Sequence, residues 1–227
     1  MKMGVISQAL VEKSFEFAYA MSFGRQGAHR DHRSGGTARR KPGEIFRDAF
    51  QGKIAECAIY EQMIREGLDV TEPTFDTWDH GVWDDEDFII NGKRVSVKST
   101  KRFGNLVLLE KADYASDGTY IPNINKEGHG SYDAVILVRM DPLVEEILRQ
   151  NRLLYSYEVD KELLSSLIYS RQWSFDIPGY ITREDFVNII NSGFVIPKHA
   201  TLNGRTVIDA NNYYIQVGDM REISTFN

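Results

Sequence analysis

The sequence contains a single cysteine, Cys57, among its 227 residues. One cysteine cannot form an internal disulfide bond, so the sequence excludes a small fold held together by disulfides and favours a reducing compartment. Cys57 falls within the apolar pattern of a predicted helix, where we expect a buried core thiol. We therefore expect a cytoplasmic protein.

Long apolar runs are also missing. No stretch approaches the roughly 20 consecutive apolar residues that a membrane-spanning helix needs. Near the N-terminus, Glu12, Lys13 and Glu16 interrupt the apolar residues, which argues against a signal peptide and favours a helix that ends at about Phe23. We expect no interaction with a membrane.

An overall excess of positive charge is absent as well. The net charge is -6, which excludes a protein held to nucleic acid by bulk charge. The charge is uneven, because residues 25–53 contain eight Lys/Arg and three Asp/Glu. Within this region, residues 24–43 include five glycines and little to bury, so we predict a flexible basic arm.

The basic arm has two interpretations. It is either a solvated loop without a partner or a segment that orders on DNA, where arginine binds phosphate and guanine through paired hydrogen bonds. In the second interpretation its candidate DNA-binding residues are Arg25, Arg30, Arg33, Arg39, Arg40 and Lys41.

The composition, 42% hydrophobic and 26% charged, is that of a globular chain long enough for one full core. Apolar periodicity predicts a helix over residues 44–65, a second helix from Pro142, a third from Lys161 and a fourth over 182–193. The last has Thr182 as N-cap and Gly193 as terminator.

Four segments read as strands besides the hairpin discussed below. They cover residues 69–71, 105–111, 132–140 and 153–160, and the third is so apolar that it should lie centrally in a sheet. We expect an α/β (α+β) fold with a central mixed β-sheet flanked by helices, in one domain over residues 1–227. Residues 194–227 should form β-hairpins, with a turn at Asn203–Gly204.

The segment "WDDEDFIINGKRVSVKST", residues 83–100, is the most informative part of the chain. Asn91–Gly92 is the preferred pair for a two-residue type I′ turn, which fixes the register of the two strands. Period-two alternation then divides the side chains between two faces. The apolar face holds Phe88, Ile90, Val95 and Val97, and the polar face holds Asp85, Asp87, Ser96 and Lys98.

This polar face is either solvated, with a weak cross-strand ion pair, or a functional site. We favour a site because a strand follows the hairpin and an apolar-faced helix precedes it, which places it inside the sheet. Ser99, Thr100 and Lys101 follow Lys98, and small polar and basic residues suit a phosphate. Thr100 and Lys101 therefore join the DNA-binding candidates.

These residues resemble the PD-(D/E)xK nuclease superfamily, which includes many type II restriction endonucleases. Its pattern is an acid at the start of a hairpin, followed by acid-x-lysine on the returning strand. Asp87 matches the first acid and Ser96-Val97-Lys98 matches the second element. Two positions depart from the pattern, because Glu86 stands where the family has proline and Ser96 where it has the second acid.

The resemblance implies a restriction-endonuclease-like core in which carboxylates hold Mg²⁺, with Mn²⁺ as a substitute, and the lysine serves the attacking water. Mg²⁺ prefers hard oxygen ligands and can activate a bound water. Asp87 and the Val97 carbonyl are candidate ligands, and Ser96 supplies a hydrogen bond. Since Ser96 has no charge, another carboxylate must replace the missing acid. Glu56 on the preceding helix is the first candidate, Glu110 the second and Asp85 the third.

The implied function is that of a type II site-specific deoxyribonuclease, which hydrolyses phosphodiester bonds of duplex DNA. The resemblance further implies a homodimer, since both strands are cut symmetrically, and a prokaryotic source. A repair or junction-resolving nuclease on the same core, a DNA-binding protein with a degenerate nuclease site and a structural protein with a merely solvated hairpin face remain as alternatives.

Overall fold

The computed structural model describes residues 3–24, 26, 40–76, 87–121, 130–204 and 206–226. Its helices are α1 (Gln8–Ser22), α2 (Pro42–Arg65), α3 (Val144–Gln150), α4 (Lys161–Tyr169) and α5 (Arg183–Ser192). Its strands are β1 (Gly4–Val5), β2 (Phe88–Ile90), β3 (Lys93–Lys101), β4 (Leu106–Glu110), β5 (Ala134–Asp141), β6 (Ser174–Thr182), β7 (Val195–Ile196), β8 (Thr201–Leu202), β9 (Thr206–Val207) and β10 (Asn212–Gln216).

A mixed five-stranded sheet forms the centre of the molecule. Its strand order is β1-β6-β5-β3-β2, in which β3 and β5 run parallel and the other neighbours run antiparallel. A smaller antiparallel sheet has the order β4-β10-β7, and β8 pairs with β9. The predicted α/β fold with a mixed sheet flanked by helices is therefore confirmed at this level, as is the central position of β5.

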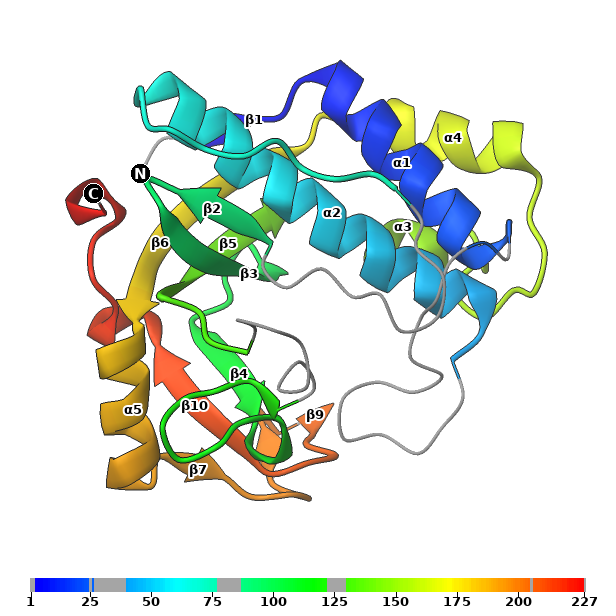
Figure 1. Cartoon of the computed structure of the whole chain (residues 1–227). Coiled ribbons are helices and arrows are strands. Elements are labelled where there is room, and N and C mark those ends of the chain that lie inside the picture. Colours follow the sequence, from blue (N-terminus) through cyan, green and yellow to red (C-terminus); the bar gives the residue numbers. More distant parts are fainter. Residues whose placement is uncertain are drawn as a thin grey trace.

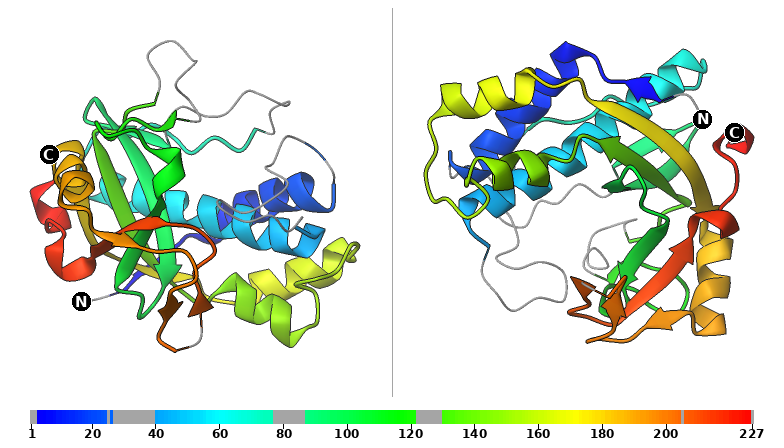
Figure 2. Two further views of the ribbon diagram at one scale, coloured as in Figure 1. Left: turned by 90° about the horizontal axis from the view of Figure 1, so that it is seen from below. Right: turned by 180° about the vertical axis from the view of Figure 1, so that it is seen from behind.

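Different elements cover the two faces of the large sheet. Helices α1 to α4 lie together on one side, while α5 and the small sheet lie on the other (Figure 1). The same division is visible from below and from behind (Figure 2). Each face has its own apolar core, because alternate residues of β5 point to opposite sides. Ile136 and Val138 belong to the core under α2, and Val135 and Leu137 to the core under α5 and β10.

The hairpin forms with the predicted turn and register, but its predicted place inside the sheet is right only for β3, because β2 is the edge strand. Asn91 and Gly92 have φ values of 49° and 78°, as a type I′ turn requires. Phe88 is paired with Val95 and Ile90 with Lys93. The side chains of Phe88, Ile90 and Val95 are at most 1% exposed, which confirms the apolar face.

The predicted helices are present within a few residues of their expected bounds. The fourth is capped as expected: the backbone N–H of Asp185 donates to the Thr182 hydroxyl, and Gly193 has a φ of 68°. The turn at Asn203–Gly204 also lies between β8 and β9 as predicted. Among the described residues, no helix is long and apolar enough to cross a membrane.

Two strand predictions are wrong. Residues 153–160 form turns, because this segment closes on the start of α2, where the Gly43 N–H donates to the Ser156 carbonyl at 3.1 Å. Leu154 alone is buried there, and Tyr155 and Tyr157 are exposed, so the alternation imitated a strand. Residues 69–71 contribute a single bridge, between Val70 and Ile90.

Cys57 is fully buried in the core, as predicted. Burial raises the pKa of its thiol to about 12, although a hydrogen bond with Ser14 acts in the opposite direction. The thiol is therefore a packing group and carries no thiolate chemistry at neutral pH.

Candidate active site

Three side chains on the polar face of the hairpin form one hydrogen-bonded chain. The Lys98 ammonium donates to the Ser96 hydroxyl oxygen at 3.0 Å, and that hydroxyl donates to Asp87 Oδ2 at 3.2 Å. The structure thus brings Asp87, Ser96 and Lys98 together as the sequence predicted. We call these three residues the hairpin trio.

The position of Asp87 follows from the point at which β2 begins. The Asp87 N–H still donates to the Val95 carbonyl at 3.1 Å, as in a sheet. On the side of β3 that faces β2, the next backbone donor after Val95 is the Val97 N–H. The Asp87 carboxylate accepts this N–H at 2.5 Å. The Asp87 side chain therefore accepts the hydrogen bond that a backbone carbonyl would accept if β2 continued further. The structure shows this contact at the Val97 N–H, and the Val97 carbonyl stays a predicted metal ligand.

The pairing of β3 with β5 fixes the side of the sheet on which the trio lies. Ser96 is aligned with Val135 and Lys98 with Leu137, both of which face α5 and the small sheet. The residues that alternate with them, Val95 and Val97, pack on the opposite face with α2. Ser96 is 1% exposed, so its hydroxyl is held away from bulk water.

The electrostatics of Lys98 set the trio apart from an ordinary ion pair. Asp87 and Lys98 are not within ion-pair distance of each other, because the Ser96 hydroxyl stands between them. Within the described ranges Lys98 pairs with no carboxylate, and its side chain is half-buried. A half-buried ammonium without a counter-ion attracts an anionic ligand strongly, since the surroundings screen it less than water does.

The candidates for the missing carboxylate lie outside the trio. Glu56 on α2 forms an ion pair with Lys53 at 2.5 Å, and Glu110 ends β4 opposite Asn212. Neither is hydrogen-bonded to Asp87, Ser96 or Lys98. Asp85 lies outside the described residues, as does Glu86. The choice among the three carboxylates thus stays a prediction.

The oxygen donors at the hairpin fit a magnesium ion in kind. In the described part of the chain, no three His, Cys, Asp or Glu side chains gather closely enough to enclose a metal ion. Mg²⁺ does not require such a cage, because it commonly binds one or two carboxylates together with waters and substrate phosphates. Asp87 can provide one carboxylate, so the site suits an ion that binds together with a phosphate.

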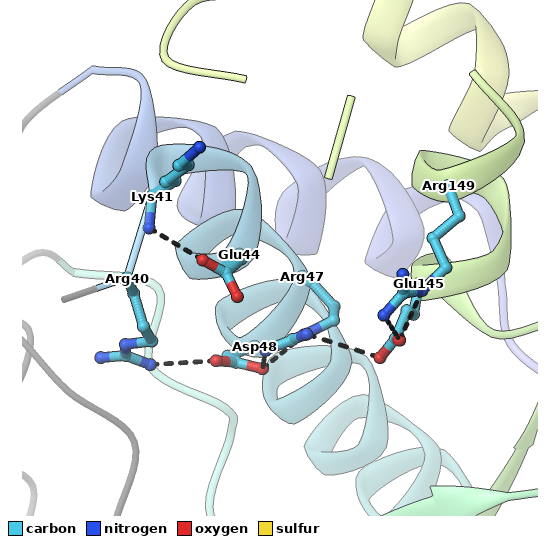
Figure 3. A network of polar contacts seen from close by, with 7 residues as sticks. All are labelled: Arg40, Lys41, Glu44, Arg47, Asp48, Glu145 and Arg149. Carbon is cyan, nitrogen blue, oxygen red and sulfur yellow. Dashed lines mark hydrogen bonds and ion pairs between the residues drawn. The ribbon is translucent and has the colours of Figure 1, made fainter. Parts of the chain in front are cut away.

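Two of the DNA-binding candidates in the predicted basic arm, Arg40 and Lys41, are described and lie at the start of α2. Arg40 pairs with Asp48 at 3.0 Å, and the Lys41 backbone N–H donates to Glu44. Figure 3 shows that these contacts continue along the helix, where Arg47 lies between Asp48 and Glu145. Most of the positive charge at this helix end is therefore balanced. The Lys41 ammonium lies over the Tyr157 ring at 5.4 Å.

The remaining DNA-binding candidates fall into two groups. Thr100 and Lys101 end β3, two and three residues beyond Lys98, and Lys101 is exposed. The other candidates, Arg25, Arg30, Arg33 and Arg39, lie outside the described residues.

One contributor to this face was missed by sequence reasoning. Arg139 of β5 is aligned with Thr100 and donates to the Gly104 carbonyl at 2.7 Å and to Asn105 Oδ1 at 2.5 Å. It also pairs with Asp176 of β6 at 3.4 Å. The signal was available, since Arg139 is the single charge inside an otherwise apolar strand segment, "AVILVRM".

Comparisons with known proteins leave the site to be interpreted from its own chemistry. No protein-family model matches the chain, and no curated protein or solved structure is significantly similar to it.

A shallow hollow of about 390 Å³ lies elsewhere, between β1 and the end of α2, and is lined by Val5, Tyr60 and Ile64 among others. None of the candidate site residues lines it.

Proposed function

We propose that this protein is a magnesium-dependent endonuclease that hydrolyses phosphodiester bonds of duplex DNA. The observation that carries the proposal is the half-buried Lys98 side chain, whose ammonium has no ion-pair partner among the described residues and is linked through Ser96 to Asp87. A lysine linked to a carboxylate on a hairpin at the edge of a mixed sheet, with β3 inside the sheet and β2 as its last strand, is the arrangement that we compare with the PD-(D/E)xK resemblance. The finer fold assignment, a restriction-endonuclease-like core, belongs to the same proposal.

Each member of the trio has a distinct proposed role. Lys98 binds the scissile phosphate or the attacking water, where its charge stabilises the negative charge of the transition state. Ser96 orients the Lys98 ammonium through the hydrogen bond at 3.0 Å. Asp87 provides a carboxylate oxygen for Mg²⁺, which when bound supplies a polarised water and neutralises phosphate charge. The Val97 N–H holds this carboxylate in place.

The sequence supports the restriction type within this class. The basic residues 25–41 provide arginines that suit phosphate and guanine, and Lys101 extends the positive charge along β3. Site-specific cleavage of both strands by a homodimer in the cytoplasm of a prokaryote is the corresponding proposal for assembly and location. A repair or junction-resolving nuclease would use the same trio on branched DNA.

One observation favours a second candidate, a DNA-binding protein without catalysis. The Asp87 carboxylate already accepts the Val97 N–H and the Ser96 hydroxyl, so it has a structural use that requires no metal. Ser96 also lacks the charge of the acid that the nuclease pattern places there. In this alternative the hairpin would bind phosphate through Lys98 and Lys101 and cut nothing.

Incubation of the protein with unmethylated plasmid and phage DNA, with Mg²⁺ or with EDTA, separates these candidates. Discrete Mg²⁺-dependent fragments support the restriction type, and cleavage confined to branched DNA supports a junction-resolving enzyme. Binding without cleavage under any divalent metal supports the non-catalytic alternative. Absence of binding rejects every DNA-based proposal.

The variant Lys98→Ala tests the site itself. We expect its cleavage rate to fall by roughly 10²- to 10⁴-fold, the usual contribution of a positioned proton-transfer or charge-stabilising group. DNA binding in EDTA should persist, because other cations remain. Lys93→Ala is the matched control, since Lys93 begins the same strand at the hairpin turn. A fully active Lys98→Ala variant would reject the proposed site.

A further inference from the structure

The turn that joins β3 to β4 displays an aromatic side chain to solvent. Phe103 is 79% exposed, more than any other large hydrophobic side chain in the described ranges. A single exposed apolar residue is common and requires no explanation by itself. Phe103 is distinctive because of how its turn is held and because of the charges around it.

Hydrogen bonds fix this turn on both sides of Phe103. The Gly104 N–H donates to the Lys101 carbonyl at 2.7 Å, and Arg139 donates to the Gly104 carbonyl and to Asn105. The Val217 N–H also donates to the Asn105 carbonyl at 3.0 Å. A side chain at Gly104 would overlap Thr100, so the turn depends on glycine. The backbone on both sides of Phe103 is therefore held in place.

One cation lies beside the exposed ring, and two more precede it along β3. Residues 98–104, "KSTKRFG", contain three basic residues and no acid. The Arg102 guanidinium lies 5.4 Å from the centre of the Phe103 ring and pairs with Asp141 at 3.0 Å. Lys101 forms no ion pair within the part of the chain that the structure describes. Aromatic rings between basic side chains are the arrangement by which proteins stack on bases while binding the phosphates of the same strand.

We infer that Phe103 stacks against a DNA base and marks the point at which this protein opens the base stack. The inference rests on the proposed function. It adds a second contact with DNA, since Lys98 lies on β3 and Phe103 lies in the turn that follows β3. From Lys98 to the end of β3 at Lys101 are three residue steps, which at about 3.3 Å per residue span roughly 10 Å, and Phe103 lies in the turn that follows. Stacked bases rise about 3.4 Å per step, so the end of β3 lies about three nucleotides from the phosphate at Lys98.

Insertion of a ring between bases costs least where a base is already unpaired. The wild-type protein should therefore bind a duplex that contains one bulged nucleotide more tightly than the fully paired duplex. In EDTA, where no cleavage occurs, fluorescence anisotropy with labelled duplexes of about 30 base pairs measures this preference.

The variant Phe103→Ala should lose this preference and bind the bulged duplex about tenfold more weakly, the scale of one lost base–aromatic stack. Its salt dependence should not change, because no phosphate contact is removed, whereas Lys101→Ala should reduce the salt dependence. Phe103→Trp should keep the preference. Leu163→Ala is the control, since Leu163 is 51% exposed on α4 without comparable surroundings.

The outcomes separate this inference from the proposed function. Equal binding of both duplexes by wild type and Phe103→Ala overturns the inference, and Mg²⁺-dependent cleavage would still stand. Loss of the preference in a protein that cuts no DNA supports the inference and rejects the nuclease. If wild type binds no DNA, both fail, and a change in oligomeric state on Phe103→Ala would assign the ring to a protein contact.

Discussion

Two groups of three side chains in this protein use the same chemical parts in different ways. The hairpin trio joins a carboxylate, a hydroxyl and an ammonium. At the start of α5, Asp185, Thr182 and Arg221 join a carboxylate, a hydroxyl and a guanidinium, and we call this group the C-terminal latch. Both groups connect segments that are separated in the sequence.

The latch is saturated within itself. Arg221 donates to both carboxylate oxygens of Asp185, from Nε at 2.6 Å and from Nη2 at 2.8 Å. The same carboxylate also accepts the Thr182 hydroxyl and backbone N–H. Hydrogen bonds from Arg221, followed by those from Thr182, lower the pKa of Asp185 to about 2. Such a closed group stabilises a fold, and each of its two charges has its counter-ion within the group.

The hairpin trio is open by comparison. Its hydroxyl separates the two charges, and Lys98 pairs with no carboxylate in the described residues. The trio therefore gains less from its own contacts than the latch does, and it keeps a cation available. The difference indicates that a site is recognised by what its groups leave unsatisfied, since the same residue types in a satisfied arrangement stabilise only the fold.

Among the variants that test this comparison, Asp87→Asn is expected to have the largest effect on DNA cleavage. Asparagine keeps an oxygen for the Val97 N–H and removes the charge, so the unfolding free energy should change little. Cleavage should fall on the order of 10²- to 10³-fold, because the metal-binding carboxylate is lost. Initial rates in Mg²⁺ measure the effect.

Asp133→Asn is the matched control for Asp87→Asn. The Asp133 carboxylate likewise accepts a β3 backbone N–H, that of Arg94 at 2.7 Å, and it lies outside the trio. If Asp87→Asn cleaved DNA as fast as Asp133→Asn, Asp87 would also be only a structural hydrogen-bond acceptor. The trio would then belong to the same class as the latch.

An intermediate effect is expected at the latch, where Asp185→Asn should lower the unfolding free energy by about 1–2 kcal/mol at neutral pH. A depressed folded-state pKa means that the stabilisation is complete above the ordinary aspartate pKa and is lost as pH falls towards 2. The difference between wild type and variant should therefore shrink from pH 5 to pH 2. Urea titrations across this range, with DNA cleavage at neutral pH unchanged, complete the test.

Local sequence signals predicted the parts of this fold that are determined locally. The Asn91–Gly92 turn fixed the hairpin register, and Thr182 and Gly193 fixed the ends of α5, because caps and tight turns depend on a few neighbouring residues. Strand β6 had no such signal. Pro178 and Gly179 interrupt its pattern, and it forms because β5 and β1 lie beside it.

In the candidate site, too, the sequence predicted the parts that local structure determines. Alternation on a hairpin of known register placed Asp87, Ser96 and Lys98 on one face. The bond from the Val97 N–H to Asp87 was not predictable, because it depends on the residue at which β2 begins. The place of Glu56 relative to the trio depends on how α2 packs, which periodicity cannot show. Its ion pair with Lys53 was open to prediction, because residues three apart on a helix are neighbours.

Ser96→Ala is expected to have the smallest effect and distinguishes two uses of the hydroxyl. The change removes the bonds to Lys98 and Asp87, yet Asp87 keeps the Val97 N–H and Lys98 can turn to water. The unfolding free energy should therefore fall by only about 1 kcal/mol. If the hydroxyl orients Lys98 for catalysis, cleavage should fall about tenfold with DNA affinity unchanged, the cost of one misplaced hydrogen bond in the transition state.

Ser99→Ala is the control for this change, since Ser99 lies on the same strand with its side chain on the opposite face. A loss of stability without a loss of cleavage rate would mean that Ser96 only fills its place in the sheet. A loss of rate in Ser96→Ala alone would mean that the uncharged residue at this position retains a function. That function would be to hold the Lys98 cation near the Asp87 carboxylate without neutralising it, which an acid at position 96 could not do.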